Sequence, residues 1–388
     1  MNVLLVKLKE PEREGQKLCY MPPMGLWSLR SALRKRGDTC EVIDMHMGDT
    51  ITGQWDIVGL SVQFSIQHEE YLRVSKIARE HGKRVVAGGF HAAVVPPPEG
   101  VEAHYGPGET FFNVDYSTPD ISAEEMERYW DKGSPHDLKS KTSRWMSVEL
   151  SRGCWQGCRY CGVRRYWGGW SNLDRWKVTN YLHDLYSMGV KELFIEDDNA
   201  TEEDNLEALL PSLYGFKWSM PNGVRIDDLN DKLLWKMKDS GCWRLSLPFE
   251  TGSLESARWM GIEKKFVPFD DAFRLVKVCK NLGIETCGFF IIGYPGEMLD
   301  DVKMTLEYAN ALPLDGRHIY IATPYPGTKL YNDCVTNGYL TCSVNDLYKN
   351  LMYNKALIRT PWLAPEDLER IRNEDREAAL RRKANADT

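Results

Sequence analysis

Three closely spaced cysteines constrain the fold and chemistry of this chain more than any other feature. They lie in the run Cys154-Trp155-Gln156-Gly157-Cys158-Arg159-Tyr160-Cys161, with three residues between the first pair and two between the second. Thiolates are the usual ligands of iron–sulfur clusters, so this spacing can hold three irons of a 4Fe–4S cluster. No nearby cysteine can ligate the fourth iron, which is therefore open to bind a substrate or cofactor directly.

A structural zinc site or a disulfide pair is the alternative interpretation of these cysteines. Structural zinc takes four ligands, typically as paired cysteine units or with histidines. No second pair follows at a suitable distance, and His183 is isolated on a predicted helix. The chain has ten cysteines and no signal-peptide layout, which predicts that the protein lies in the reducing cytoplasm. Clustered thiols in that compartment bind metal more often than they form disulfides. We expect the others to be buried thiols: Cys19, Cys40, Cys242, Cys279, Cys287, Cys334 and Cys342.

Length and charge limit the classes of protein and partner. The 388 residues exceed one ordinary domain, so more than one is expected. No run of eighteen apolar residues appears, which predicts no membrane span. The net charge of −7 argues against nucleic acid as a partner, because phosphate binding needs a basic surface. We expect a cytoplasmic protein with domains over 1–115 and 145–330, a linker over 116–144 and a C-terminal extension over 331–388.

The first hundred residues alternate short apolar strands with helices, which predicts a doubly wound parallel sheet. Strands are expected at Val3–Leu8, Cys40–Met45, Ile57–Val62 and Arg84–Ala87, with helices over Gly25–Arg36 and about Gln67–His81. Ligands of such sheets bind beyond the carboxyl ends of the strands. That edge carries Ser61-Val62-Gln63, Gly88-Gly89-Phe90-His91 and Gly106-Pro107-Gly108-Glu109. Glycines there allow close approach of a ligand, although tight turns alone would also explain them.

A second α/β series follows a polar linker that carries one predicted helix, Ala123–Trp130. Its strands are expected at Trp145–Leu150, Glu192–Glu196, Phe216–Met220, Trp243–Phe249, Ile284–Ile292 and His318–Thr323. Six β/α units suit a partial barrel whose active site lies at the carboxyl ends of its strands. The cysteine run directly follows the first of these strands. The chain is expected to be irregular after Thr328 and to end in a charged, solvated helix from Pro365 to about Arg382.

The strand ends of this second series carry polar residues and glycines. They include Glu196-Asp197-Asp198-Asn199, Asn222-Gly223-Val224-Arg225, Glu250-Thr251-Gly252-Ser253 and Gly293-Tyr294-Pro295-Gly296-Glu297. Singly, these residues would serve as helix caps or turns. Carboxylates that converge on one mouth would suit a ligand with an ammonium group and a ribose diol, such as S-adenosylmethionine (SAM).

Together, the cysteine run and the strand-end motifs resemble the radical SAM superfamily, especially the branch with an N-terminal cobalamin-binding domain. The resemblance covers roughly residues 1–335. It implies that Cys154, Cys158 and Cys161 hold a 4Fe–4S cluster whose open iron binds SAM. The SAM contacts that it implies are Tyr160, Asp197 or Asp198, Arg225, Glu250 and Gly293, although the glycine pattern of the fifth strand is displaced by one residue.

The first domain resembles the cobalamin-binding fold at its strand ends. The implied cobalamin contacts are Ser61, Gln63, Gly88, Gly89, Gly108 and Glu109. Domains that ligate cobalt carry an Asp-x-His-x-x-Gly loop after the first strand, and this chain lacks it there. Asp44-Met45-His46-Met47-Gly48 is one residue short and follows the second strand, so we expect His46 to be a surface or loop histidine. The axial ligand of cobalt stays open.

The resemblance implies a cobalamin-dependent radical SAM methyltransferase that moves a methyl group from methylcobalamin to an unactivated carbon. The acceptor would be a small molecule, a peptide or a protein, and the electrons would come from a donor of the ferredoxin or flavodoxin type. The chain also resembles the methyltransferases that modify methyl-coenzyme M reductase, including its glutamine C-methyltransferases. A cobalamin-dependent radical SAM cyclase or ring-rearranging enzyme shares the same motifs. An iron–sulfur electron carrier is the non-enzymatic alternative, but it would need a fourth cysteine ligand.

Overall fold

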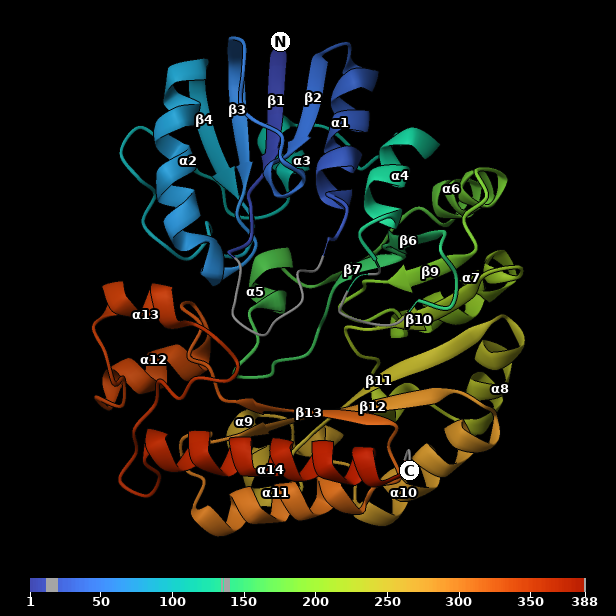
Figure 1. The fold of residues 1–388 in the computed structure, drawn as a ribbon, viewed down its shortest axis with the longest axis vertical. Helices are drawn as coiled ribbons and strands as arrows, with labels where there is room; N and C mark the ends of the chain where they lie inside the picture. Colours follow the sequence, from blue (N-terminus) through green and yellow to red (C-terminus); the bar gives the residue numbers. More distant parts are fainter. Residues whose placement is uncertain (12–19, 134, 136–139, 387–388) are drawn as a thin grey trace. The chain divides into compact units, whose positions relative to one another are not determined.

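The computed structural model describes residues 1–11, 20–133, 135 and 140–386. The chain divides into two compact units. The first unit comprises Met1–Trp155, Val163–Asn222 and Lys236–Trp243, and the second comprises Gln156–Gly162, Gly223–Trp235 and Arg244–Thr388. Figure 1 follows their elements from the N-terminal sheet in blue to the last helix in red.

The first unit begins with a parallel sheet of strand order β2-β1-β3-β4-β5. Its strands are β1 (Asn2–Lys7), β2 (Thr39–Asp44), β3 (Trp55–Ser61), β4 (Gly82–Gly88) and β5 (Glu102–Ala103). Helices α1 (Met24–Arg36) and α2 (His68–His81) flank it (Figure 1). Right-handed crossovers on either side of β1 place these helices on opposite faces. The predicted doubly wound sheet is therefore confirmed.

The alternation of side chains along β1 explains how this sheet is covered on both faces. Val3 and Leu5 pack with Leu29 and Leu33 of α1 in one buried cluster. Helix α1 ends where predicted because Gly37 adopts a left-handed conformation, with φ of 96°, which glycine allows at little cost. The two short elements β5 and α3 (Gly108–Phe112) were not predicted.

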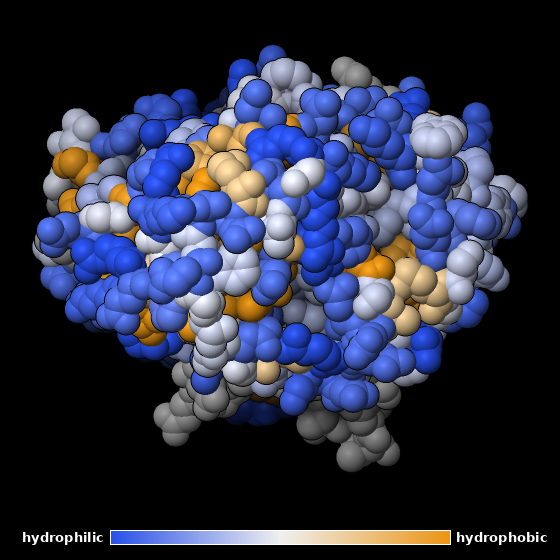
Figure 2. Space-filling view, turned by 90° about the horizontal axis from the view of Figure 1, so that it is seen from above, coloured by the Kyte–Doolittle hydropathy of each residue, from blue (hydrophilic) through white to orange (hydrophobic). Residues whose placement is uncertain are grey.

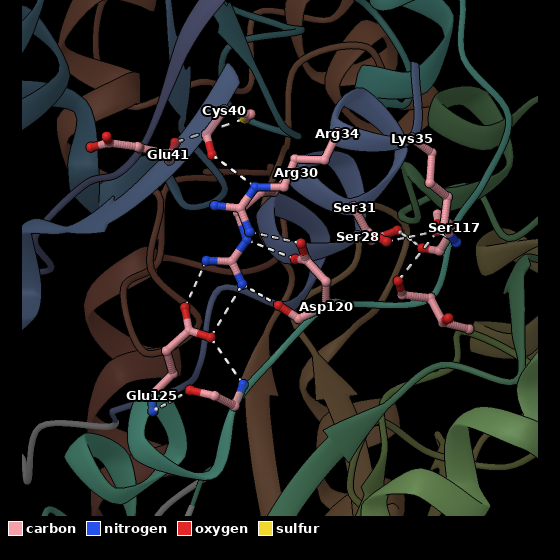
Figure 3. Close-up of polar contacts among 12 residues, drawn as sticks. Ser28, Arg30, Ser31, Arg34, Lys35, Cys40, Glu41, Ser117, Asp120 and Glu125 are labelled. Carbon is pink, nitrogen blue, oxygen red and sulfur yellow. Dashed lines mark hydrogen bonds and ion pairs between the residues drawn. The ribbon is translucent and has the colours of Figure 1, made fainter. Parts of the chain in front are cut away.

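Helix α4 (Ala123–Trp130) has the predicted bounds, and the segment before it packs against α1. The buried guanidinium of Arg30 donates to Asp120 at 2.7 Å and to Glu125 at 2.6 Å. Figure 3 shows both carboxylates turned toward this guanidinium, together with the contact of Ser28 to Ser117. Polar contacts therefore fasten this segment to the first sheet's helix layer.

The first unit continues with three parallel strands and a hairpin. The parallel strands are β6 (Trp145–Val148), β9 (Glu192–Ile195) and β10 (Lys217–Met220). The antiparallel hairpin pairs β7 (Ser151–Gly153) with β8 (Trp170–Asn172). The helices of this part are α5 (Val163–Trp167), α6 (Arg175–Ser187) and α7 (Asn205–Leu213).

The remaining strands of the second series also run parallel. They are β11 (Cys242–Glu250), β12 (Glu285–Ile292) and β13 (Gly316–Ile321). The further helices are α8 (Asp231–Asp239), α9 (Leu254–Met260), α10 (Phe269–Asn281), α11 (Leu299–Ala311), α12 (Lys329–Thr336), α13 (Val344–Asn350) and α14 (Pro365–Ala386). The α/β architecture with six strands in the second series and a helical C-terminus is confirmed.

Two expectations about the C-terminal region were wrong. The stretch after Thr328 holds α12 and α13 in place of irregular structure. Helix α14 is not merely solvated, because Leu368 is buried and Asp375 accepts two hydrogen bonds from Arg317 at 2.8 Å. One face of α14 packs on strands of the second unit, and the charged sequence of the helix did not indicate this packing.

The visible surface is mostly polar (Figure 2), and most of the scattered cysteines are buried as the sequence predicts. The face in Figure 2 is mostly hydrophilic, with small separate apolar patches. No helix within the described ranges is long and apolar enough to cross a membrane. Of the scattered cysteines, Cys342 is only half-buried, contrary to expectation, and Cys19 lies outside the described residues. The others are buried as expected: Cys40, Cys242, Cys279, Cys287 and Cys334.

Candidate functional site

The cysteine loop begins directly after β7 and ends just before α5. A glycine at its start is required, because a Cβ on Gly153 would lie 1.9 Å from the carbonyl oxygen of Gly169 on the hairpin. Cys154 and Cys158 are half-buried and Cys161 is exposed. None of these three residues is fully buried.

No three His, Cys, Asp or Glu side chains converge as a metal-binding group in the part of the chain that the structure describes. This includes the three loop cysteines. Metal ligands commonly come together only when the metal binds. The three thiolate donors of the loop still fit an iron–sulfur cluster by their chemistry and number.

Cys158 lies in the part of the loop that belongs to the second unit. The backbone N–H of Arg159 donates to the carbonyl oxygen of Met260 at 2.9 Å, and Arg159 accepts a hydrogen bond from Leu330 at 2.9 Å. The ammonium of Lys265 donates to the Cys158 sulfur at 3.4 Å. The loop is therefore anchored there by its backbone, with a positive charge beside one candidate ligand.

Tyr160 and Glu250, two of the predicted SAM contacts, lie together in the second unit. The hydroxyl of Tyr160 donates to Glu250 Oε1 at 2.8 Å. Glu250 has φ of 67° at the irregular end of β11, a conformation that a non-glycine residue adopts at a cost. Burial raises the pKa of Glu250 to about 7. The strained backbone turns this carboxyl toward the aromatic residue of the cysteine loop.

Asp197 and Asp198 support the chain on its way into the cysteine loop. Asp197 accepts from the N–H of Leu150 at 2.8 Å and from the Ser151 hydroxyl at 2.5 Å. Asp198 accepts from the N–H of Gly153 at 3.3 Å. Burial raises the pKa of Asp197 to about 8 and that of Asp198 to about 6. Both carboxyls therefore hold the backbone of β7 in place through hydrogen bonds. This structural role is additional to the SAM binding that we expect of them.

Arg225 and Gly293 have local structural roles in the second unit. Arg225 pairs with Asp227, to which its Nε donates at 3.0 Å. Gly293 has φ of 80°, and a Cβ there would lie 2.6 Å from Leu368 of α14. The Gly293 N–H donates to Glu297 Oε2 at 2.6 Å. The glycine is thus needed for the turn after β12 and for the packing of α14.

Two of the glycines predicted at the edge of the first sheet, Gly89 and Gly108, are needed for close packing. A Cβ on Gly89 would lie 2.6 Å from the carbonyl oxygen of Val62, and one on Gly108 would lie 2.8 Å from Leu29. Gly88 ends β4, where a Cβ would meet open space.

The polar residues predicted at the same edge have protein partners. Ser61 accepts from the Gln63 side chain at 3.2 Å. Glu109 is buried and pairs with Arg152 at 2.8 Å. This ion pair could not be predicted from the sequence, since its members lie 43 positions apart.

His46 lies in a loop as predicted, but it is not at the surface. It sits in the short turn Met45–Met47, where it is buried and its Nδ1 accepts from the N–H of Glu10 at 3.2 Å. The ring of Tyr20 lies edge-on to the imidazole of His46, with the two ring centroids 4.6 Å apart. Of the two predicted alternatives, a surface or a loop histidine, the structure therefore supports the loop position, with the ring buried.

A histidine pair at the edge of the first sheet was missed. His91 Nε2 lies 3.0 Å from His68 Nδ1, and His91 Nδ1 lies 3.1 Å from the Ser65 hydroxyl. Burial, with His68 nearby, lowers the pKa of His91 to about 4. The only signal in the sequence was the position of His91 directly after the glycines at the end of β4.

Residues 148–309 match the model of the Radical SAM superfamily. This stretch includes the cysteine loop, so the prediction of a radical SAM domain in this part of the chain is confirmed.

Among curated proteins, the chain is similar to cytidylyl-2-hydroxyethylphosphonate methyltransferase of Streptomyces wedmorensis, with 26% identity over 251 residues. That match covers 61% of this chain and 46% of the relative, so it spans about half of that protein's length. An uncharacterised methyltransferase of Pyrococcus horikoshii is 26% identical over 379 residues, with 82% of this chain and 80% of the relative covered.

Two solved structures share the fold. The radical SAM methyltransferase TsrM of Kitasatospora setae, solved with cobalamin and a 4Fe–4S cluster, aligns with a TM-score of 0.68 at 15% identity, over 86% of this chain and 78% of that one. The cobalamin-dependent radical SAM enzyme OxsB, solved with aquacobalamin, aligns with a TM-score of 0.60 at 17% identity. This alignment covers 89% of this chain and 56% of OxsB. Each alignment covers more than four fifths of this chain, which is more than the radical SAM domain alone.

Proposed function

We propose that this protein is a cobalamin-dependent radical SAM methyltransferase that acts on carbon. The observation that carries the proposal is the cysteine loop of the radical SAM domain. Among the described cysteines, the loop thiols and that of Cys342 are the ones that are not buried. A three-thiolate cluster site with one open iron is the requirement for binding SAM directly.

The N-terminal sheet supports the cobalamin part of the proposal. Its strand order, 2-1-3-4-5, is that of doubly wound sheets that bind flat cofactors beyond their strand ends. That edge carries Ser61, Gln63, Gly88 and Gly89. The named methyltransferases among the relatives and the two cobalamin-bound structures of the same fold point the same way.

The residues of the chain would bind and orient the cofactors. Cys154, Cys158 and Cys161 would hold the cluster, and Tyr160 would keep the Glu250 carboxyl directed toward SAM. When bound, the cluster with SAM supplies a carbon-centred radical and the corrin carries the methyl group. The protein's own contribution is alignment and the exclusion of water.

The acceptor would be an unactivated carbon of a small molecule or of a protein residue such as glutamine. A ferredoxin or flavodoxin would supply the electrons, and the reducing cytoplasm would keep the loop thiols from forming disulfides. The domain boundaries that we propose for this function are 1–115, 145–330 and 331–388, with 116–144 as the linker.

Anaerobic reconstitution with iron, sulfide and hydroxocobalamin tests the proposal. We expect about four irons and one corrin per chain, and the formation of both 5′-deoxyadenosine and S-adenosylhomocysteine from SAM under reduction. Cys154→Ser, Cys158→Ser or Cys161→Ser should abolish the cluster signal, whereas Cys342→Ser should retain it.

The product pattern separates the alternatives. Deoxyadenosine without S-adenosylhomocysteine would favour the cyclase, and a redox-active cluster that forms neither product would favour the electron carrier. A cluster with deoxyadenosine but no retained corrin would contradict the cobalamin part.

A further inference from the structure

The two elements that frame the cysteine loop both contact the edge of the first sheet. Strand β7 ends one residue before Cys154, and α5 begins two residues after Cys161. Both belong to the first unit, as does the sheet. The contacts below are therefore contacts within one compact unit.

Arg152 of β7 makes the first connection. Its Nη1 donates to Glu109 Oε1 at 2.8 Å and its Nε to Glu149 Oε2 at 3.0 Å. The side chains of Arg152 and Glu109 are only 10% and 11% exposed. Charges at this depth interact more strongly than on the surface, because water screens them less. The pair therefore fixes β7 to the first turn of α3, which holds Glu109.

Two aromatic rings also lie within cation–π distance of the Arg152 guanidinium. It lies 4.7 Å from the ring centre of Tyr116 and 5.2 Å from that of Trp167. Trp167 is the last residue of α5, so this guanidinium contacts both elements that frame the loop. Arginine is suited to this task because its flat cation can pair and stack at once.

Tyr166 of α5 makes the second connection. Its hydroxyl donates to the carbonyl oxygen of Gly106 at 2.9 Å. Its ring stacks on Phe90, with centroids 4.1 Å apart and planes at 23°. Phe90 directly follows Gly88 and Gly89. The helix after the cysteine loop therefore rests on the strand-end segment that we propose faces the corrin.

We propose that Arg152 is a positioning residue that couples cobalamin binding at the first sheet to the cluster loop, through Glu109 and with the support of Tyr166. This inference rests on the proposed function, because it requires both cofactors. Arg152 and Tyr166 touch neither cofactor in this scheme. They set where the ends of the cysteine loop stand relative to the segments Phe90–His91 and Gly106–Glu109.

The physical reason is linkage. A corrin bound beyond the strand ends would restrict the segment Gly106–Glu109 at the start of α3, and the buried ion pair would transmit that restriction to β7. A cluster bound by the cysteine loop would restrict β7 and α5 and, by the same contacts, the first-sheet edge. Coupling of this kind is reciprocal: each ligand strengthens the binding of the other by the same factor.

The test compares hydroxocobalamin binding by the iron-free and the cluster-loaded full-length protein. We expect the cluster-loaded protein to bind the corrin roughly 5- to 150-fold more tightly, the range typical of coupled sites. In Arg152→Gln this ratio should fall toward one, and Arg152→Lys should restore it in part. The matched control is Arg84→Gln, since Arg84 pairs with Glu102 at 2.8 Å on the same sheet but is about half exposed.

The ratio of the two dissociation constants separates coupling from a merely structural role. A structural role would weaken both forms equally and leave the ratio unchanged, which would overturn the proposal, as would a ratio of one in the wild type. If Arg152→Gln does not fold, Glu109→Gln and Tyr166→Phe should lower the ratio as milder variants. A wild-type protein that binds no corrin in either form would instead refute the cobalamin part of the proposed function, and the coupling with it.

Discussion

At the scale of single residues, burial decides how the carboxyl groups of the second unit behave. Glu297 is completely buried and accepts hydrogen bonds from the N–H groups of Gly293 and Tyr294, at 2.6 Å and 2.9 Å. These bonds favour its charged form, but burial outweighs them and raises its pKa from 4.5 to about 7. The carboxyl therefore binds its proton more tightly in the folded chain than in the unfolded one.

We predict that this group makes the protein less stable as the pH rises. The folded state holds the extra proton between about pH 4.5 and 7, so the stabilisation is complete below 4.5 and is lost as the pH rises through 7. Glu297→Gln should remove this component, which amounts to roughly 3 kcal/mol. Urea unfolding at pH 5 and pH 8 measures it. Glu255→Gln, at an exposed position, serves as the control, and an unchanged pH dependence in Glu297→Gln would contradict the prediction.

The hydroxyl of Tyr160 gives a second prediction at this scale. Tyr160→Phe leaves the buried Glu250 carboxyl without that donor, and we expect a loss of about 1–3 kcal/mol in the free energy of unfolding. Tyr214→Phe removes the same type of bond, from a tyrosine hydroxyl to Asp239 at 2.5 Å, but at an exposed site. We expect this control to cost less than about 0.5 kcal/mol. Equal losses in urea unfolding would show that the burial of Glu250 is irrelevant.

At the scale of elements, polar contacts connect α1 to the segment before α4. The side chain of Arg30 is 6% exposed and forms ion pairs with two carboxylates, Asp120 and Glu125. The side chain of Arg34 is 48% exposed and pairs with Asp120 alone. Arg30→Met leaves Asp120 and Glu125 without their buried cation. We expect a loss of roughly 2–3 kcal/mol, since both carboxylates keep some solvent. Arg34→Met should cost less than about 1 kcal/mol. Chemical denaturation of both variants compares the two, and similar losses would contradict this account.

Helix α14 offers a second prediction at this scale. Leu368 is 1% exposed and fills the space that the missing side chain of Gly293 leaves, whereas Leu380 on the same helix is 59% exposed. Leu368→Ala should cost about 2–5 kcal/mol, the usual effect of a cavity in a packed site. Leu380→Ala should change stability by less than about 0.5 kcal/mol. A shift of the thermal midpoint in Leu380→Ala as large as that in Leu368→Ala would mean that α14 is not docked through this face.

At the scale of the whole molecule, the two compact units predict unfolding that is not two-state. Chains with several units commonly populate intermediates. The first signal is the fluorescence of buried tryptophans such as Trp145 and Trp218, which lie in the first unit. The second signal is far-ultraviolet circular dichroism, which reports on the helices of both units. We expect the two signals to give different urea midpoints for the apoprotein. Coincident curves, with one midpoint, would contradict this expectation.

The regular elements could be predicted because their signals are local. Runs such as Val3–Leu8 are mostly apolar, and Gly37 marks the end of α1. Such patterns need only neighbouring residues. The three-residue strands β7 and β8 carry no such pattern, and they form only because each pairs with the other. Helix α14 has a charged sequence, so its packed face was not apparent.

The sequence by itself determined the chemistry of the candidate site: three thiols at fixed spacing, the carboxyls at strand ends and the two α/β series. Spacing along a chain is a covalent property, so these features are visible before folding. Tertiary structure alone decided that Arg152 meets Glu109, that Tyr166 stacks on Phe90 and that His46 is buried. Such contacts join residues far apart in sequence, and their strength depends on a burial that only the packed chain creates.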